Sequence, residues 1–186
     1  MQLKMHLGRK RMYKYIKRLL DIIISLILII ILSPILLIML IITKIEFSGN
    51  PIYSQYRIGK NEKPFKIYKF KTMDDNTKKT TKVSRVIRTI GLDELLQLFN
   101  VLNGTMSIVG PRPFIVGDSL PSMYNKKRHS VRPGITGLAQ VNGRITLTHK
   151  EKLKYDDIYV NNVSFIMDLK IVLKTIKYVF KVIIGK

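Results

Sequence analysis

The stretch "ILIIILSPILLIMLII", residues 27–42, consists of aliphatic side chains and Met39, except for Ser33 and Pro34 at its centre. It forms most of an apolar run over residues 19–42. As a straight helix this run would extend about 36 Å, enough to cross a hydrocarbon core of about 30 Å. No small-residue cleavage site follows it, and the run is too long for a signal peptide. The stretch therefore predicts a membrane-embedded segment.

Basic residues flank this run on both sides. Residues 1–18 contain seven Lys or Arg and no acid, and seven more lie between residues 44 and 71. Because basic flanks resist translocation, both ends favour the cytoplasmic side. Pro34 lacks an N–H and clashes with the carbonyl of Ile30, and the Ser33 hydroxyl can bond to a carbonyl freed by a break. We expect a re-entrant helix broken at Ser33-Pro34; a kinked single span is the alternative.

The remaining sequence predicts a small α/β domain that is mostly helical. Residues 51–59 and 63–73 are rich in aromatic and β-branched side chains, which predicts a β-hairpin. Apolar residues recur at helical spacing over 91–102. Residues 163–184 form a basic amphipathic helix that suits an anionic membrane surface or, alternatively, packs on its own domain. We divide the chain into a basic N-terminal segment (1–18), a re-entrant membrane helix (19–43) and a cytoplasmic catalytic domain (44–186).

The charge balance narrows the class of partner. Lys and Arg outnumber Asp and Glu by 33 to 12, giving a net charge of +21. This charge indicates a polyanionic binding partner, which could be a nucleic acid, an anionic lipid or a phosphorylated substrate. The chain has no cysteine, so neither disulfides nor thiol chemistry is available. Its three histidines (His6, His129 and His149) lack the spacing of zinc ligands.

Two adjacent acids stand out in "RTIGLDELLQLFN", residues 88–100. Asp93 and Glu94 fall at the start of a predicted helix, where backbone N–H groups and the helix dipole favour anions. Acids are also ordinary helix-starting residues, so their position alone does not assign catalysis. A carboxylate pair among guanidinium groups suits Mg²⁺ and a diphosphate, and it suits DNA poorly. The basic side chains in question are Lys69, Arg88, Arg112 and Arg144.

Five segments follow one another in a fixed order: "LSPILL", "KIYKFKTM", "LDELLQLFNVLNGTMSIVGPRP", "RPGITGLAQVNGR" and "YDDIYV". As an ordered series they resemble the monotopic phosphoglycosyl transferases, the bacterial sugar transferase family, in its small PglC-type form. The resemblance covers residues 12–180. It implies transfer of a phosphosugar from a UDP-sugar to polyprenol (undecaprenyl) phosphate with release of UMP, the first membrane step of bacterial glycoconjugate synthesis.

The same resemblance implies roles for individual residues. Asp93 corresponds to the nucleophile and Mg²⁺ ligand, which forms a covalent aspartyl-phosphosugar intermediate, and Glu94 corresponds to its partner. The helix broken at Ser33 and Pro34 would anchor a monotopic enzyme in the cytoplasmic leaflet of the inner membrane. Substrate contacts are implied for Lys69, Arg88, Arg112, Gln140 and Arg144.

Three features depart from the family pattern. Leu96 stands where proline is usual, Thr105 occupies a position that is commonly Asp, and the loop over residues 74–82 is short. The first two bear on local helix geometry and the third on sugar recognition. Two rivals stay open: a non-catalytic, membrane-tethered basic adaptor that binds nucleic acid or anionic lipid, and a one-step transferase in which Asp93 only holds metal. The sequence indicates neither the sugar nor the oligomeric state.

Overall fold

The computed structural model describes residues 2–47, 49–75, 77–118, 125–143 and 146–184. It is mostly helical with two small sheets, which confirms the expected α/β class. In chain order the elements, with η for a 3₁₀ helix, are α1 (Gln2–Glu46), β1 (Ile52–Ile58), η1 (Lys60–Glu62), β2 (Pro64–Phe70), α2 (Lys82–Ile90), η2 (Leu92–Glu94), α3 (Gln97–Leu102), β3 (Ser107–Val109), η3 (Lys126–Ser130), β4 (Gly134–Thr136), α4 (Leu138–Val141), α5 (His149–Asn161) and α6 (Phe165–Ile184).

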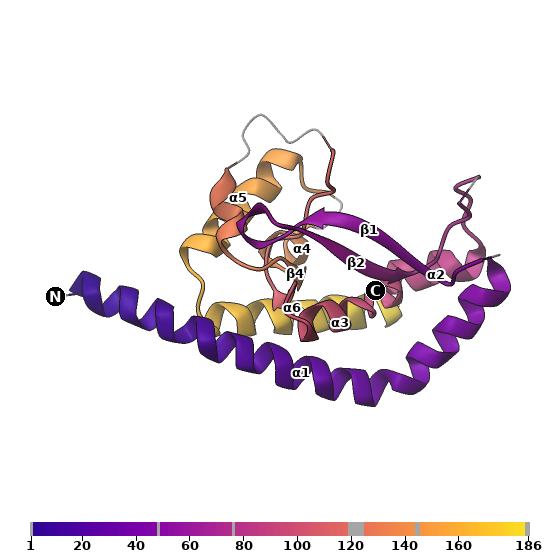
Figure 1. Cartoon of the computed structure of the whole chain (residues 1–186), viewed down its shortest axis with the longest axis horizontal. Helices are drawn as coiled ribbons and strands as arrows, with labels where there is room; N and C mark the ends of the chain where they lie inside the picture. Colours follow the sequence, from indigo (N-terminus) through magenta and orange to yellow (C-terminus); the bar gives the residue numbers. More distant parts are fainter. Residues whose placement is uncertain (1, 48, 76, 119–124, 144–145, 185–186) are drawn as a thin grey trace.

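Helix α1 is bent, and the rest of the molecule lies on the inner side of the bend (Figure 1). It is continuous through Ser33 and Pro34, so the expected break is a bend within one helix. The hydroxyl of Ser33 donates to the carbonyl of Ile30 at 2.8 Å, which satisfies an acceptor that Pro34, lacking an N–H, leaves without its helical donor. The stretch Met12–Glu46 is the one helix among the described residues that is long and apolar enough to cross a membrane.

Polar side chains attach the first half of α1 to the body. Arg18 donates to the carbonyls of the last two residues of α3, at 2.6 and 3.0 Å, and its positive charge suits the C-terminal end of that helix. Asp21 accepts hydrogen bonds from Ser107 Oγ and from the next backbone N–H, both at 3.0 Å. Lys17 pairs with Asp168 of α6 at 2.6 Å. Part of the basic flank is therefore structural.

The second half of α1 is attached through apolar packing. Leu36 and Met39 are buried against Phe70 of β2, Ile87 of α2 and Leu96. Both halves of the bent helix thus contact the body, so α1 is an integral part of the fold.

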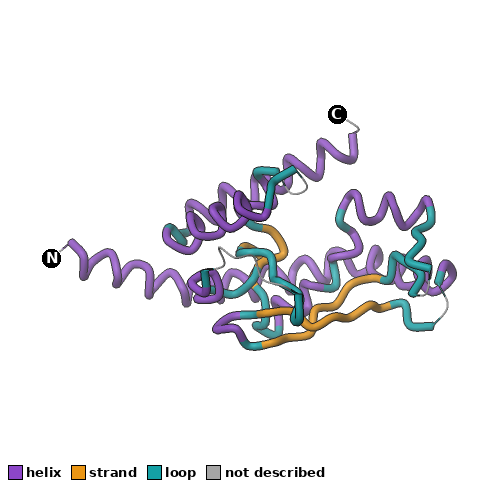
Figure 2. The backbone as a smooth tube through the Cα atoms, turned by 90° about the horizontal axis from the view of Figure 1, so that it is seen from above, coloured by secondary structure: helices purple, strands orange, loops and turns teal. Residues whose placement is uncertain are grey.

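The expected β-hairpin is confirmed. Strands β1 and β2 pair antiparallel from Ile52–Phe70 to Ile58–Pro64, and Figure 2 shows them running side by side. A second sheet was not expected: β3 and β4 pair in parallel, bringing Ser107 opposite Gly134. A Cβ at Gly134 would overlap the backbone of Gly110, so this close pairing requires glycine.

The helix expected over residues 91–102 is divided. Gly91 adopts a left-handed conformation (φ 81°) that ends α2, after which η2 and then α3 follow. Leu96 is the residue immediately before α3 and has φ −63°, a value that a proline ring also imposes, so this departure from the family pattern is compatible with the same backbone geometry. Thr105 donates to the Asn100 carbonyl and to the Asn103 side chain just beyond α3.

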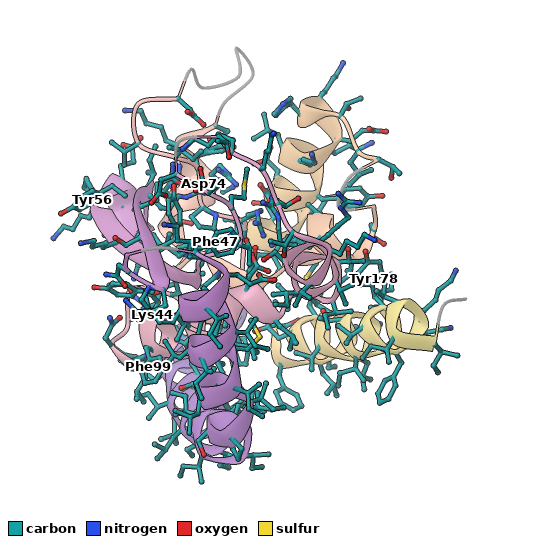
Figure 3. The ribbon with its side chains drawn as sticks, turned by 90° about the vertical axis from the view of Figure 1, so that its right-hand side faces the viewer. Lys44, Phe47, Tyr56, Asp74, Phe99 and Tyr178 are labelled. Atoms are coloured by element: carbon teal, nitrogen blue, oxygen red, sulfur yellow. The ribbon has the colours of Figure 1, made fainter. Side chains whose placement is uncertain are left out.

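Helix α6 confirms the expected C-terminal helix over most of its length. Ile171 is buried, whereas Ile166, Phe180 and Ile183 are each about 60% exposed, at 64%, 59% and 61%. Along the lower part of α1 and the outward face of α6, most side chains drawn in Figure 3 carry no nitrogen or oxygen atom. The molecule therefore has an apolar side, formed by these two helices, beneath the hairpin and α5.

Candidate active site

The acidic pair lies on the single turn η2, between α2 and α3. Asp93 and Glu94 are 8% and 7% exposed, so both are buried. The left-handed turn at Gly91 redirects the chain immediately before them. The sequence placed the pair at a helix start; the structure places it on a separate turn that holds two adjacent carboxylates inside the body.

Two cations hold Glu94. Lys69 Nζ of β2 lies 2.8 Å from Glu94 Oε1, and Arg112 reaches the same oxygen at 2.8 Å through Nη2 and Oε2 at 3.4 Å through Nη1. Burial disfavours the carboxylate, but Arg112 and Lys69 outweigh burial and hold the pKa of Glu94 well below its usual value. Burial lowers the pKa of Lys69, which Glu94 partly opposes. Glu94 is therefore an ionised, fixed acceptor.

A cavity of about 330 Å³ lies beside the pair, and we call it the polar cavity. Asp93 lines it together with Lys69 and Arg88, which come from three different elements. The loop after β2 contributes to it, so the short loop noted in the sequence borders this cavity. The other charged or polar lining residues are Tyr53, Gln55, Arg57, Lys71, Thr72, Asp74, Asp75 and Lys78.

A second cavity of about 320 Å³ lies next to the first, and Arg57 lines both. Arg112 and Gln140 line this second cavity together with Arg128 and His149. Neither amide atom of Gln140 has a hydrogen-bond partner among the described residues. The structure thus separates the predicted substrate residues between two adjoining cavities, with Arg112 contacting Glu94 from the second.

The predicted residues are therefore mostly, but not all, at one place. Lys69 and Arg88 join Asp93 at the polar cavity, Arg112 binds Glu94, and Gln140 lies in the second cavity. Arg144 lies outside the described residues. The guanidinium fork of Arg112, expected on phosphate, is engaged by Glu94.

One site residue was missed by sequence reasoning. Arg57 counted only as a flanking charge, but it lines both cavities and donates to Gln55 Oε1 at 2.8 Å and to the Pro113 carbonyl at 3.2 Å. Tyr53, Gln55 and Arg57 alternate along β1, so they share one face of the hairpin. The spacing of two residues between these side chains was the sequence signal that could have placed Arg57 with the other two.

The residues of the polar cavity suit Mg²⁺ only if a bound substrate supplies some of its ligands. Among the described residues no three His, Cys, Asp or Glu form a metal-binding group. Mg²⁺, however, commonly takes one or two carboxylates and completes its octahedron with substrate phosphates and water. Asp93 supplies such a carboxylate beside basic side chains that suit a diphosphate. The arrangement can thus hold a phosphorylated substrate against a buried carboxylate.

The family model described as "Bacterial sugar transferase" matches residues 12–182. The chain is 40% identical over 177 residues to the "Uncharacterized sugar transferase EpsL" of Bacillus subtilis, covering 88% of this chain and 87% of the relative.

Two further relatives carry more specific names. The UDP-glucose:undecaprenyl-phosphate glucose-1-phosphate transferase of Klebsiella pneumoniae is 44% identical over 192 residues, covering 91% of this chain. The UDP-N-acetylgalactosamine-undecaprenyl-phosphate N-acetylgalactosaminephosphotransferase of Aeromonas hydrophila is 37% identical over 184 residues, covering 89%. This chain spans 40% and 44% of the length of these two relatives.

Proposed function

This chain belongs to the bacterial sugar transferase family, and from that membership we propose that it transfers a sugar phosphate from a UDP-sugar to a polyprenol phosphate with release of UMP. The observation that carries the proposal is the buried pair itself: Glu94 is fixed by Lys69 and Arg112, while its neighbour Asp93 lines the basic polar cavity. The names of relatives that act on undecaprenyl phosphate support the acceptor class.

The donor diphosphate binds in the polar cavity. Arg88 and Lys69 neutralise its negative charge, so that a carboxylate can approach phosphorus without prohibitive repulsion. Asp93 would hold Mg²⁺, which would supply further charge neutralisation when bound. Glu94 accepts from both cations at Oε1 and from Arg112 also at Oε2, and it keeps Lys69 and Arg112 in place beside Asp93.

In the first step a carboxylate oxygen of Asp93 forms a bond to the sugar-bearing phosphorus. The bond from that phosphorus to the bridging oxygen breaks, and its electron pair leaves with UMP. In the second step an oxygen of the polyprenol phosphate bonds to the same phosphorus and the Asp93 carboxylate is released. Covalent catalysis of this kind replaces one difficult displacement by two easier ones.

The apolar side supports a membrane location for this chemistry. The exposed apolar residues of α1 and α6 suit lipid, and the bend of α1 suits a re-entrant helix whose two ends stay in the cytoplasm. We therefore place the enzyme in the cytoplasmic leaflet of the bacterial inner membrane, where the phosphate of a polyprenol lies at the interface. No role for nucleic acid is proposed.

The deciding experiment measures UMP. Purified protein in detergent or nanodiscs is incubated with Mg²⁺, undecaprenyl phosphate and a panel of UDP-sugars. Release of UMP that requires the acceptor supports the proposal and identifies the sugar. Absence of UMP with every sugar, from protein with a normal melting transition, would instead favour a non-catalytic basic adaptor.

A second arm of the same experiment separates two steps from one. With UDP-sugar but no polyprenol phosphate, the intact mass of the protein should rise by one phosphosugar. Catalytic turnover without any trapped adduct would favour direct transfer, with Asp93 serving only as a metal ligand.

A further inference from the structure

A third cavity, of about 200 Å³, lies on the other side of the acidic pair, and we call it the apolar cavity. Leucines of α1 and aliphatic residues of α6 form much of its wall, and Glu94 is the only charged residue among the described residues that line it. The hydroxyls of Thr136 and Thr175 lie 2.7 Å apart and bond to each other, so these two polar groups are already satisfied. Its contributors on α1 and α6 are Leu28, Leu32, Val172 and Ile176.

The two catalytic acids face different cavities. Asp93 lines the polar cavity and Glu94, the next residue, lines the apolar cavity. The pair therefore forms part of the partition between a compartment suited to a diphosphate and one suited to hydrocarbon. This arrangement suits a reaction that joins a water-soluble donor to a lipid acceptor.

The apolar cavity is built from the two helices that expose apolar surface. Helices α1 and α6 both carry exposed aliphatic side chains along their length and both line the cavity. Hydrocarbon that enters between them exchanges one apolar environment for another, so its transfer from the bilayer involves little desolvation cost. A phosphate at the inner end of such a chain would lie near Glu94, whose carboxylate also binds the cations Lys69 and Arg112.

We propose that the apolar cavity binds the phosphate-proximal isoprene units of the polyprenol phosphate and thereby presents its phosphate to the acidic pair. The proposal rests on the proposed function for the identity of the acceptor. A cavity of about 150 Å³ is large enough for benzene, so the observed volume holds a short branched segment and not a whole polyprenol. The remaining chain lies outside, in the lipid.

The test uses a matched pair of substitutions on α6. Val172→Trp fills the apolar cavity, whereas Leu173→Trp makes the same change at the next residue, which is 57% exposed and does not line it. In mixed micelles, Val172→Trp should raise the KM for undecaprenyl phosphate at least tenfold and leave the KM for UDP-sugar within twofold. Leu173→Trp should change neither. An unchanged acceptor KM in Val172→Trp, whatever its kcat, overturns the proposal.

A measurement on the unaltered protein guards against misfolding of the variant. A polyprenyl phosphate with a diazirine in its first isoprene unit is irradiated with the wild-type enzyme, and the labelled peptides are sequenced by mass spectrometry. Label on residues 28–32 and 172–176, displaced by unlabelled undecaprenyl phosphate, supports the site. Label confined to other segments overturns it. Wild-type enzyme that uses no polyprenol phosphate would contradict the proposed function itself.

Discussion

Arg128 and Asp156 form a buried ion pair, with 2.7 Å between Nη2 and Oδ2 and side-chain exposures of 3% and 5%. The same Nη2 atom donates to the backbone carbonyl of Arg112 at 2.9 Å, and the guanidinium carbon lies 3.7 Å from the centre of the Phe114 ring. Asp156 is thus connected, through Arg128, to the backbone of the residue whose side chain binds Glu94.

Asp156→Asn should destabilise the protein and slow the reaction. Removing one partner of a buried pair leaves an uncompensated charge, at a cost of about 3–5 kcal/mol, which lowers the melting temperature of a chain of this length on the order of 10 °C. Thermal melting in detergent measures the loss of stability, and the rate of UMP release measures the slower reaction. Asp157→Asn is the matched control at the neighbouring residue, and equal melting of the two variants would refute the structural role.

Asp93→Asn should abolish UMP release, because an amide is a poor nucleophile and a weak ligand for Mg²⁺. Glu94→Gln should be severely impaired, because Lys69 and Arg112 lose the charge that holds them. Turnover of purified variants with UDP-sugar and undecaprenyl phosphate measures both. Wild-type rates in Asp93→Asn would exclude its role as nucleophile.

Arg112→Lys should lower kcat/KM at least tenfold, equivalent to about 1.4 kcal/mol. Lysine cannot reproduce the two contacts that the guanidinium makes with Glu94. If Arg112 only supports its loop, the variant will instead show a lower melting temperature with normal kinetics. Measuring both properties on the same preparation separates the two roles.

The ionisation of Glu94 should appear in the pH dependence of stability. Because its folded pKa lies below the usual 4.5, the carboxylate stabilises the fold above that pH, and this contribution is lost as the pH falls toward the folded pKa. When the pH is lowered from 7 to below 4.5, the melting temperature of Glu94→Gln should therefore fall less than that of the wild type. Parallel curves for the two proteins would show that Glu94 contributes no such stabilisation.

Replacing Ser33 and Pro34 by Ala and Leu should straighten α1 and shift the protein toward a spanning form that loses activity. The chain has no native cysteine, so single cysteines can report sidedness. In the otherwise wild-type protein, Lys4→Cys and Asn61→Cys should both resist an impermeant thiol reagent in intact cells and react after lysis. Labelling of the Lys4 site from outside would show that α1 spans the membrane.

Local patterns in the sequence predicted the hairpin, the C-terminal helix and the basic surroundings of the acidic pair. Two missed helices had readable caps. Thr81 accepts from the backbone of Ser84 at the start of α2, and Thr148 and Glu151 form a capping box at the start of α5.

Other features could not be read from local sequence. The strands β3 and β4 are three residues each and pair across an intervening segment, so neither has a periodic signal of its own. Arg18 and Asp21 have no local sequence signal that indicates their role, because both bind the body through partners more than 80 residues away. Such contacts depend on the folded chain as a whole.

The pairing of Lys17 with Asp168 joins positions 151 residues apart. A ribosome makes 151 residues in on the order of 10 s, so α1 is synthesised well before its partner on α6 exists. During that interval the apolar helix can enter the lipid and bind residues 101–108 through Arg18 and Asp21, while its contact with α6 is still unmade. The Lys17–Asp168 pair therefore forms last among these polar contacts and joins α6 to a helix that is already attached to the body.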